Sequence, residues 1–300
     1  MTRQRLGQHF LADLHWREEI ARAIRISPHS TVPLVSDGKH CWIEVGAGHG
    51  EMTEHLAAMG DPVHAIEFDA PLAAGLKRLA KNLPNLNVIH ADVLKTDLAE
   101  IAAGRRIRLY GNLPYYITSP ILQHFFEFAD LIDEIHIVIQ TEVALRLAAE
   151  PGTRDYGYLS VLTQLHTRPE FVFEIPRAAF NPPPEVTSAL VTLRLPGERA
   201  KLFPEGTSSN ANEHEANARE TSEESPAQKR KPLDAETNFL NFVKLCFSQK
   251  RKTLVNNLRS AAKPDTIRAA LESLTLRPDA RAEQLSVVQF AALHAQLKKQ

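Results

Sequence analysis

The sequence predicts an α/β protein with a mostly parallel sheet, followed by a small all-helical region. Between Trp42 and Leu195, short runs of β-branched residues alternate with longer helix-like stretches, as in proteins built from β-α-β units. From about residue 237 onward, apolar residues recur only at helical spacing. A chain of 300 residues exceeds the usual size of one domain, which favours a full catalytic domain plus a smaller one.

Short apolar runs mark the strands of the expected sheet. The parallel strands are expected at Cys41–Val45, Val63–Phe68, Asn87–His90, Arg108–Gly111 and His136–Gln140. Helices between them are expected at Met52–Met59, Pro71–Leu83 and Pro120–Phe128. Two later runs, Phe171–Ile175 and Ala189–Leu195, are expected to close one edge of the sheet.

The composition changes after residue 196, where Ser, Asn, Glu, Lys and Pro dominate and large apolar residues almost vanish. Such a segment predicts a disordered or loosely ordered linker. We therefore expect a catalytic domain over 1–196, a linker over 197–236 and a helical domain over 237–300. The helices expected in the last domain are Thr237–Ser248, Lys250–Ala262, Asp265–Ser273 and Ala282–Lys298.

The bulk composition limits the class of protein. No run approaches the roughly 18 apolar residues of a membrane span, so we expect no membrane partner. Charged residues from Asp13 to Glu19 interrupt the apolar core that a signal peptide needs, and we expect a cytoplasmic monomer. The net charge of −1 means that any surface for nucleic acid must be local.

Cysteine and histidine usage argues against structural cross-links and metal. Only two cysteines occur, Cys41 and Cys246, which suits free thiols in a reducing compartment. The thirteen histidines include no HxxxH or HExxH spacing supported by a carboxylate. We expect no metal site.

A glycine-rich turn follows the first parallel strand, in the segment Ile43–Gly50. Gly46 and Gly48 lack Cβ atoms, so the backbone there can approach a ligand closely. An acid at the end of the next strand, Glu67, suits a nicotinamide site equally well. Two further acids, Glu44 inside the first strand and Asp92 after the third, are not called for by such a site.

This arrangement resembles Rossmann-like class I methyltransferases. The resemblance implies that Gly46 and Gly48 line the methionine part of S-adenosylmethionine, that Glu67 accepts both ribose hydroxyls and that Asp92 meets the adenine amino group. An ionised carboxylate only accepts hydrogen bonds, so it suits two vicinal hydroxyl donors. The alternative is that these acids are ordinary strand-end residues facing solvent.

The tetrapeptide Asn112–Tyr115 follows a strand directly and so lies on the same carboxyl edge. An exocyclic adenine amine is a poor nucleophile until acceptors favour a pyramidal nitrogen. The Asn112 side-chain oxygen and the Leu113 carbonyl supply such acceptors. Pro114 biases Leu113 toward an extended conformation, and Tyr115 can stack on the base, worth roughly 1–3 kcal/mol. The alternative is a turn that merely ends a strand.

The Asn-Leu-Pro-Tyr form of this signature resembles the ribosomal RNA adenine dimethyltransferase family. Leu6–Leu11 is similar to that family's Phe-Gly-Gln-Asn-Phe-Leu element, which implies cofactor contacts by His9 and Leu11. Phe180–Ala189 is similar to its Phe-x-Pro-x-Pro-Lys-Val element, which implies that Phe180 covers the target base.

The tail segment Phe247–Leu258 is similar to the Phe-x-Gln-Arg-Arg-Lys-Thr-Leu element of the family's small-subunit branch. This resemblance implies dimethylation of adenosines near the 3′ end of small-subunit rRNA during ribosome biogenesis, with the small ribosomal subunit as partner. The residues expected to contact RNA are Arg3, Arg5, Lys250, Arg251 and Lys252.

Three positions depart from the family pattern: His9 replaces Asn, Thr141 replaces a basic residue, and Glu185 replaces Lys. Lost cations weaken phosphate binding. Alternatives that stay open are a methyltransferase for adenine in DNA or for protein glutamine, a non-catalytic RNA-binding assembly factor, and, more distantly, a nicotinamide oxidoreductase.

Overall fold

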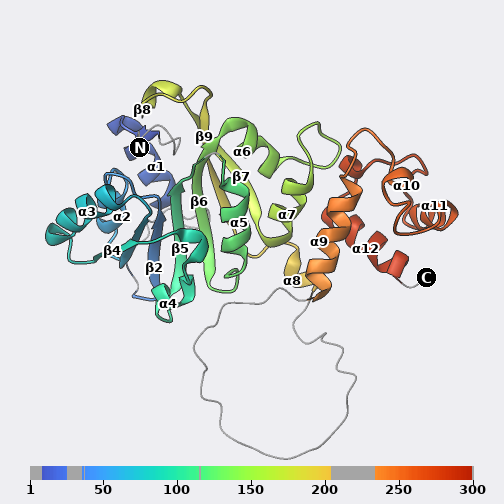
Figure 1. The fold of residues 1–300 in the computed structure, drawn as a ribbon, viewed down its shortest axis with the longest axis horizontal. Helices are drawn as coiled ribbons and strands as arrows, with labels where there is room; N and C mark the ends of the chain where they lie inside the picture. The colour runs from blue at the N-terminus through green and yellow to red at the C-terminus, as the bar shows by residue number, and fades with distance from the viewer. Residues whose placement is uncertain (1–8, 26–35, 37, 115, 204–233, 299–300) are drawn as a thin grey trace, which may run out of the picture.

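The computed structural model describes residues 9–25, 36, 38–114, 116–203 and 234–298. A twisted sheet with helices on both faces forms one part, and a group of helices packs beside it (Figure 1). The α/β class with a helical C-terminal region is thus confirmed.

Seven strands of the described chain form the main sheet, in the order β4-β3-β2-β5-β6-β9-β7. Their bounds are β2 His40–Val45, β3 Val63–Glu67, β4 Leu86–His90, β5 Arg106–Asn112, β6 Ile132–Gln140, β7 Arg168–Ile175 and β9 Ser188–Arg194. Strands β2 to β6 are mutually parallel, and β9 runs antiparallel to both β6 and β7. The expected strands are confirmed, including the late pair at one edge.

The helices of this part are mostly short and flank the strands. They are α1 Leu14–Arg25, α2 Thr53–Ala57, α3 Ala70–Leu79, α4 Leu98–Ala102, α5 Thr118–Phe126, α6 Thr141–Ala148, α7 Tyr158–His166 and α8 Arg199–Leu202. Short 3-10 turns are η2 Ala80–Asn82, η3 Val93–Lys95 and η4 Arg177–Ala179. A separate two-stranded ladder pairs β1 Phe10–Leu11 with β8 Phe180–Asn181.

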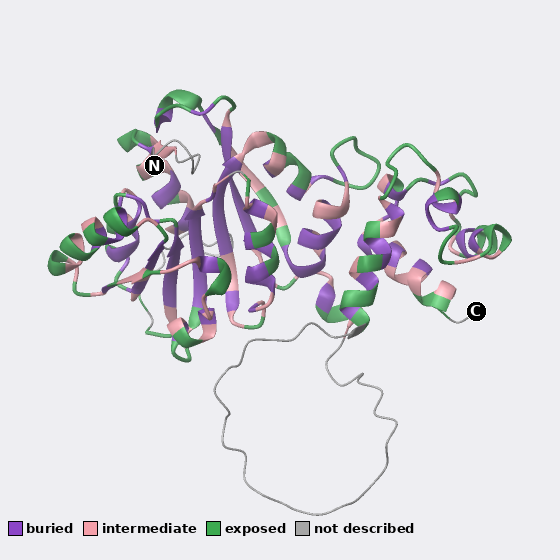
Figure 2. Cartoon of the chain, viewed as in Figure 1, coloured by how far each residue is buried: buried purple, intermediate pink, exposed green. Residues whose placement is uncertain are grey.

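Both faces of the sheet are buried, as the purple strands in Figure 2 show. Alternation along β2 sends Ile43 and Val45 into one core, which includes residues of α4, α5 and α7. Trp42 points into the other core, which includes residues of α1, α2 and α3. Continuous apolar strands are expected when helices cover both faces of a parallel sheet.

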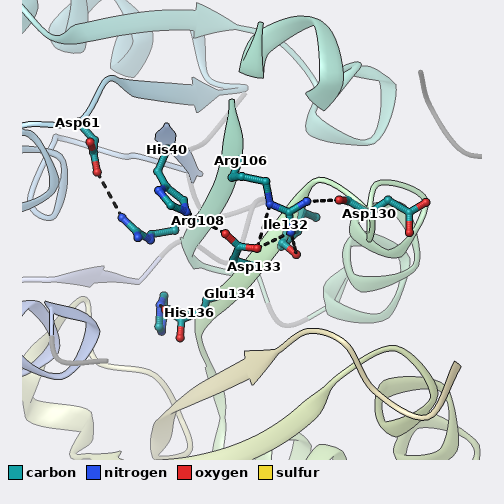
Figure 3. Close-up of polar contacts among 9 residues, drawn as sticks. All are labelled: His40, Asp61, Arg106, Arg108, Asp130, Ile132, Asp133, Glu134 and His136. Atoms are coloured by element: carbon teal, nitrogen blue, oxygen red, sulfur yellow. Dashed lines mark hydrogen bonds and ion pairs between the residues drawn. The ribbon is translucent and has the colours of Figure 1, made fainter. Parts of the chain in front are cut away.

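Charged side chains form a network at the amino ends of β2, β5 and β6 (Figure 3). Asp133 accepts hydrogen bonds from Arg106 and contacts His40, whose Nε2 lies 2.9 Å from the carboxylate. Arg108 pairs with the buried Asp61 at 3.3 Å. Because these groups lie at the opposite edge from the carboxyl ends, they support the sheet and not the ligand site.

The C-terminal helices are α9 Asp234–Cys246, α10 Leu254–Asn257, α11 Pro264–Ser273 and α12 Val287–Lys298, with η5 Ala282–Gln284 before the last. Their core also includes Tyr156, Val161 and Leu165 from the region of α7. This helical part therefore shares a core with the preceding chain and does not close on itself.

The expected linker over 197–236 was wrong at both ends. Residues 197–203 include α8, and α9 begins at Asp234, three residues before the expected helical domain. The physical reason is a buried ion pair: Arg199 Nε donates to Glu236 Oε2 at 2.7 Å, and His166 Nε2 lies 3.3 Å from Glu236 Oε1. The rest of that segment, 204–233, lies outside the described residues.

The helix expected over Lys250–Ala262 was also wrong, because only Leu254–Asn257 is helical. The Asn257 side chain donates to the carbonyls of Cys246 at 2.6 Å and Gln249 at 3.2 Å, so it caps the carboxyl end of α9. Lys252 N donates to Gln249 O at 2.9 Å and closes a turn. The basic run 250–252 therefore lies in an exposed turn.

Cys41 and Cys246 are both buried free thiols, as expected. In the part of the chain that the structure describes, no helix is long and apolar enough to span a membrane. Across those same residues, no three His, Cys, Asp or Glu side chains gather as a metal site would require.

Candidate active site

A cavity of about 280 Å³ lies at the carboxyl ends of β2, β3, β4 and β5. β2 has β3 on one side and β5 on the other, so the order of connections reverses there. Open α/β sheets bind ligands at this switch point. The cavity is lined by His9, Phe10, Val45, Gly46, Gly48, Ile66, Glu67, Phe68, Ala91, Asp92, Val93, Leu94, Asn112, Leu113, Pro114, Tyr116, Ile117 and Ile121.

The glycine turn forms the floor of this cavity. Gly46 and Gly48 have φ values of +69° and +60°, which disfavour residues with a Cβ. A Cβ at Gly48 would also lie 3.1 Å from the Phe10 ring. The turn is anchored to the sheet because Gly46 N donates to Ile66 O at 2.9 Å.

Glu67 and Asp92 face the cavity from neighbouring strand ends. Glu67 accepts hydrogen bonds from Gly48 N at 2.9 Å and Asp69 N at 2.8 Å. Burial raises the pKa of Glu67, and these backbone donors oppose that rise. Asp92 accepts from Leu94 N at 3.1 Å. Each carboxylate is thus oriented by backbone donors at the cavity wall.

Glu44 does not line the cavity. It is 2% exposed and accepts a hydrogen bond from Thr53 Oγ1 at 2.5 Å, at the start of α2. Burial raises the pKa of Glu44 to about 8. Its position therefore stabilises the turn between β2 and α2 and gives it no direct contact with a ligand.

The tetrapeptide lies across the cavity from Glu67. Asn112 Nδ2 donates to the His9 carbonyl at 2.8 Å, and Leu113 N donates to Val138 O at 3.0 Å. The Pro114 carbonyl closes a turn by accepting from Ile117 N at 3.2 Å. Asn112, Leu113 and Pro114 line the cavity, while Tyr115 lies outside the described residues.

The other predicted residues differ in their positions. His9 lines the cavity. Leu11 and Phe180 do not line it; each is 3% exposed, and they pair with one another across the β1–β8 ladder. The side chains of both belong to the core beside α1. Arg3 and Arg5 lie outside the described residues.

Three apolar residues in the walls of the cavity were not predicted from the sequence. Phe68 is 63% exposed directly after Glu67, and Tyr116 is 62% exposed after the tetrapeptide. Leu94 is 36% exposed after Asp92. Large apolar residues left exposed at strand ends mark a ligand wall, because burial elsewhere would otherwise be favoured. The available signal was a large apolar residue one or two positions after each strand-end acid.

The strand order, with antiparallel β9 between β6 and β7, and the polar groups at the carboxyl ends together define a class I methyltransferase fold. A family model described as ribosomal RNA adenine dimethylase matches residues 1–203. The chain belongs to that family.

Curated relatives cover nearly the whole chain. Ribosomal RNA small subunit methyltransferase A of Koribacter versatilis is 36% identical over 308 residues, covering 98% of this chain and 94% of the relative. The protein of that name from Xanthomonas campestris pv. campestris is 37% identical over 292 residues, covering 97% and 95%. The resemblance read from the tetrapeptide and the tail is confirmed at the level of family.

Solved structures share the fold. A dimethyladenosine transferase from Plasmodium falciparum is 22% identical with a TM-score of 0.69, covering 97% of this chain and 98% of its own. The 23S rRNA methyltransferase ErmE is 24% identical with a TM-score of 0.65, and the match covers 96% of this chain and 99% of that structure's chain. Both span the sheet and the helical region.

Proposed function

We propose that this protein is a monomeric, cytoplasmic enzyme that transfers methyl groups from S-adenosylmethionine to N6 of adenosines near the 3′ end of small-subunit rRNA. The observation that carries the proposal is the placement of Asn112 and Leu113 in one cavity with Glu67 and Asp92. An amine-orienting group and two acceptors for a nucleoside thus face one another.

The cavity suits the cofactor in size and chemistry. About 280 Å³ approaches the lower range of small-molecule pockets. Glu67 presents a carboxylate for two ribose hydroxyls, and Asp92 presents one for an adenine amine. Phe68, which follows Glu67, and Leu94, two residues after Asp92, supply apolar walls for a planar base. When bound, the cofactor would supply an electrophilic methyl group on a sulfonium.

The tetrapeptide orients the adenine amine. Asn112 Oδ1 accepts one N–H and the Leu113 carbonyl accepts the other, so the nitrogen lone pair points at the methyl carbon. The amine nitrogen held by Asn112 and Leu113 would receive the methyl group from the bound cofactor, whose sulfur would keep the electron pair of the bond that breaks. The methylated amine then loses a proton to water, so no strong base is required. The Pro114 carbonyl is occupied by its turn, which leaves the Leu113 carbonyl for this role.

Three loops at the end of the molecule form a surface for RNA. We name this the three-loop surface; it comprises residues 150–157, 247–253 and 275–284. Its loops are joined by hydrogen bonds from Lys250 Nζ to Arg154 O at 2.5 Å and from Gly152 N to Glu283 O at 2.7 Å. Directly after the second loop, Leu254 N donates to Ala280 O of the third loop at 2.8 Å.

The three-loop surface gathers cations from distant parts of the sequence. Its exposed cations include Arg154, Lys250, Arg251, Lys252 and Arg281. In Figure 1 the first two loops lie near one another along the upper edge, where β1 and β8 also lie. Such residues bind phosphates whatever the RNA sequence is, and so they position the RNA for methylation at the cavity.

Labelled S-adenosylmethionine tests the substrate. Unmethylated small subunits, large subunits and small subunits already dimethylated would each be incubated with the enzyme, and the label mapped by fragmenting the rRNA. We expect label only in the unmethylated small subunit, within the fragment at the 3′ end. Label in the large subunit, or throughout the small-subunit rRNA, would contradict the proposal.

A further inference from the structure

We propose that His9 is a positioning residue for Asn112: its carbonyl decides which end of the Asn112 amide faces the target amine, and its imidazole fastens that carbonyl to Pro182. This inference rests on the proposed function. It assigns to His9 a part in orienting the catalytic amide, separate from any contact with the cofactor.

The orientation of the Asn112 side chain follows from one hydrogen bond. Its Nδ2 donates to the His9 carbonyl at 2.8 Å. The donor and acceptor of an amide point to opposite sides, so this bond turns Oδ1 away from His9. The flipped amide would lose the bond and place two oxygens against each other. It would also present a donor to the target amine, which itself needs an acceptor.

The ladder between β1 and β8 points the His9 carbonyl away from β8. Phe10 pairs with Asn181 and Leu11 with Phe180, so the register places His9 opposite Pro182. Because Pro182 has no N–H, Phe10 and Asn181 must be the pair that exchanges backbone hydrogen bonds, and His9 and Pro182 form the adjacent pair that does not. In such a pair the backbone carbonyl points away from the partner strand, and the His9 carbonyl accepts from the Asn112 side chain.

The His9 imidazole adds a cross-strand contact to the ladder. His9 Nδ1 lies 2.8 Å from the Pro182 carbonyl. Because a carbonyl only accepts, Nδ1 must carry the proton and donate. A ladder of two residue pairs is short, so this additional bond limits the movement of the residue that holds Asn112. His9 thus links Asn112 to the loop that follows Phe180.

Kinetics of side-chain variants separate positioning from cofactor binding. His9→Phe keeps a ring but removes the donor, whereas His9→Asn keeps a donor. The matched control is His15→Ala, at an exposed histidine of the same N-terminal segment that does not line the cavity. The readouts are kcat at saturating cofactor and RNA, and the cofactor Kd by calorimetry.

We expect His9→Phe to lower kcat by about tenfold, less than the full loss of an aimed polar group, with His9→Asn within about threefold of wild type. His15→Ala should match wild type. A raised cofactor Kd with unchanged kcat in His9→Phe would overturn the proposal, because it would show a cofactor contact only.

Side-chain amide exchange tests the same bond without activity. In protein labelled with 15N-asparagine, the signal pair absent from Asn112→Ala identifies the Asn112 amide. We expect its protons to exchange slowly in wild type and several times faster in His9→Phe and His9→Ala. Equal exchange in all three would overturn the inference even if the wild type methylates rRNA. An inactive wild type with slow exchange would refute only the proposed function.

Discussion

Glu44 shows how burial sets the charge of a side chain beside a binding site. Burial raises the pKa of Glu44 in the folded protein to about 8, well above the ordinary value of 4.5 for a glutamate. Between these pH values the unfolded chain ionises Glu44 while the folded chain keeps the proton. The folded state therefore binds more protons, and stability falls as pH rises through this window.

Replacing Glu44 tests that linkage. Glu44→Gln keeps an acceptor for Thr53 but cannot ionise, so its free energy of unfolding should fall less than that of wild type between pH 5 and pH 8. One unit of pKa corresponds to about 1.4 kcal/mol, and the difference should be at least that large. Urea unfolding at four pH values measures it, with the exposed Glu100→Gln as control. Parallel pH profiles for wild type and Glu44→Gln would contradict the account.

Replacing Glu67 is expected to weaken binding of the cofactor. Glu67→Gln places an amide NH₂ against one of the donors Gly48 N and Asp69 N, and removes one acceptor for the ribose. A hydrogen bond to a charged group contributes about 1.5–3 kcal/mol, so we expect Kd for S-adenosylmethionine to rise by about tenfold or more. Calorimetry measures this, with exposed Glu54→Gln as the control.

The same carboxylate predicts a pH dependence. Because burial raises the pKa of Glu67, protonation removes its charge at a higher pH than for an ordinary carboxyl. Cofactor affinity of wild type should therefore weaken as the pH falls toward that raised value, and Glu67→Gln should lack this part of the profile. An identical pH profile in both proteins would exclude Glu67 as the titrating group.

At the scale of elements, a buried ion pair joins α8 to α9. Arg199 is 8% exposed and Glu236 is 4% exposed. His166, which contacts Glu236, stacks on Phe126 with ring centroids 4.4 Å apart. Arg199→Ala leaves a carboxylate buried without its main partner, which costs about 3–5 kcal/mol. Lys201→Ala removes an exposed pair from the same helix and should cost under about 1 kcal/mol. Urea unfolding compares the two, and equal losses would contradict the account.

Elements differed in how well the sequence predicted them. Strands such as β2 and β5 can be predicted from their continuous apolar runs, because helices cover both faces of the sheet. β1 and β8 have two residues each and form only because they pair with one another over a long separation in sequence. The residues around each strand therefore do not predict it. The prediction of a helix from Lys250 onward was wrong because the Asn257 side chain caps α9. The spacing of apolar residues does not reveal such a cap.

The site was predictable where its groups are polar. Asn112, Glu67 and Asp92 stand at strand ends, and parallel strands bring such positions to one edge. The walls formed by Phe10 and Phe68 were not predictable in the same way, because apolar residues are expected in cores everywhere. The burial of Phe180 in the core depends on its pairing with β1, a long-range contact.

For the whole molecule, RNA binding should depend on salt through the three-loop surface. Replacing Lys250, Arg251 and Lys252 together with Ala should weaken small-subunit binding and lower the slope of log K against log salt by about 2–3, for up to three lost phosphate contacts. The matched control replaces three cations on or next to α3, Lys77, Arg78 and Lys81, which lie at the far side of the sheet (Figure 1). Filter binding at several salt concentrations measures both slopes, and equal slopes would contradict the assignment.

The proposed role of Asn112, which lines the cavity together with Glu67 and Asp92, is tested most directly by nucleoside mass spectrometry. Unmethylated small subunits would be incubated with S-adenosylmethionine and either wild type or Asn112→Ala, and the rRNA digested to nucleosides. We predict N6,N6-dimethyladenosine with wild type and at least a hundredfold less with Asn112→Ala, on the scale of losing an aimed polar group. Product at the wild-type level with Asn112→Ala, or none with wild type, would contradict the account.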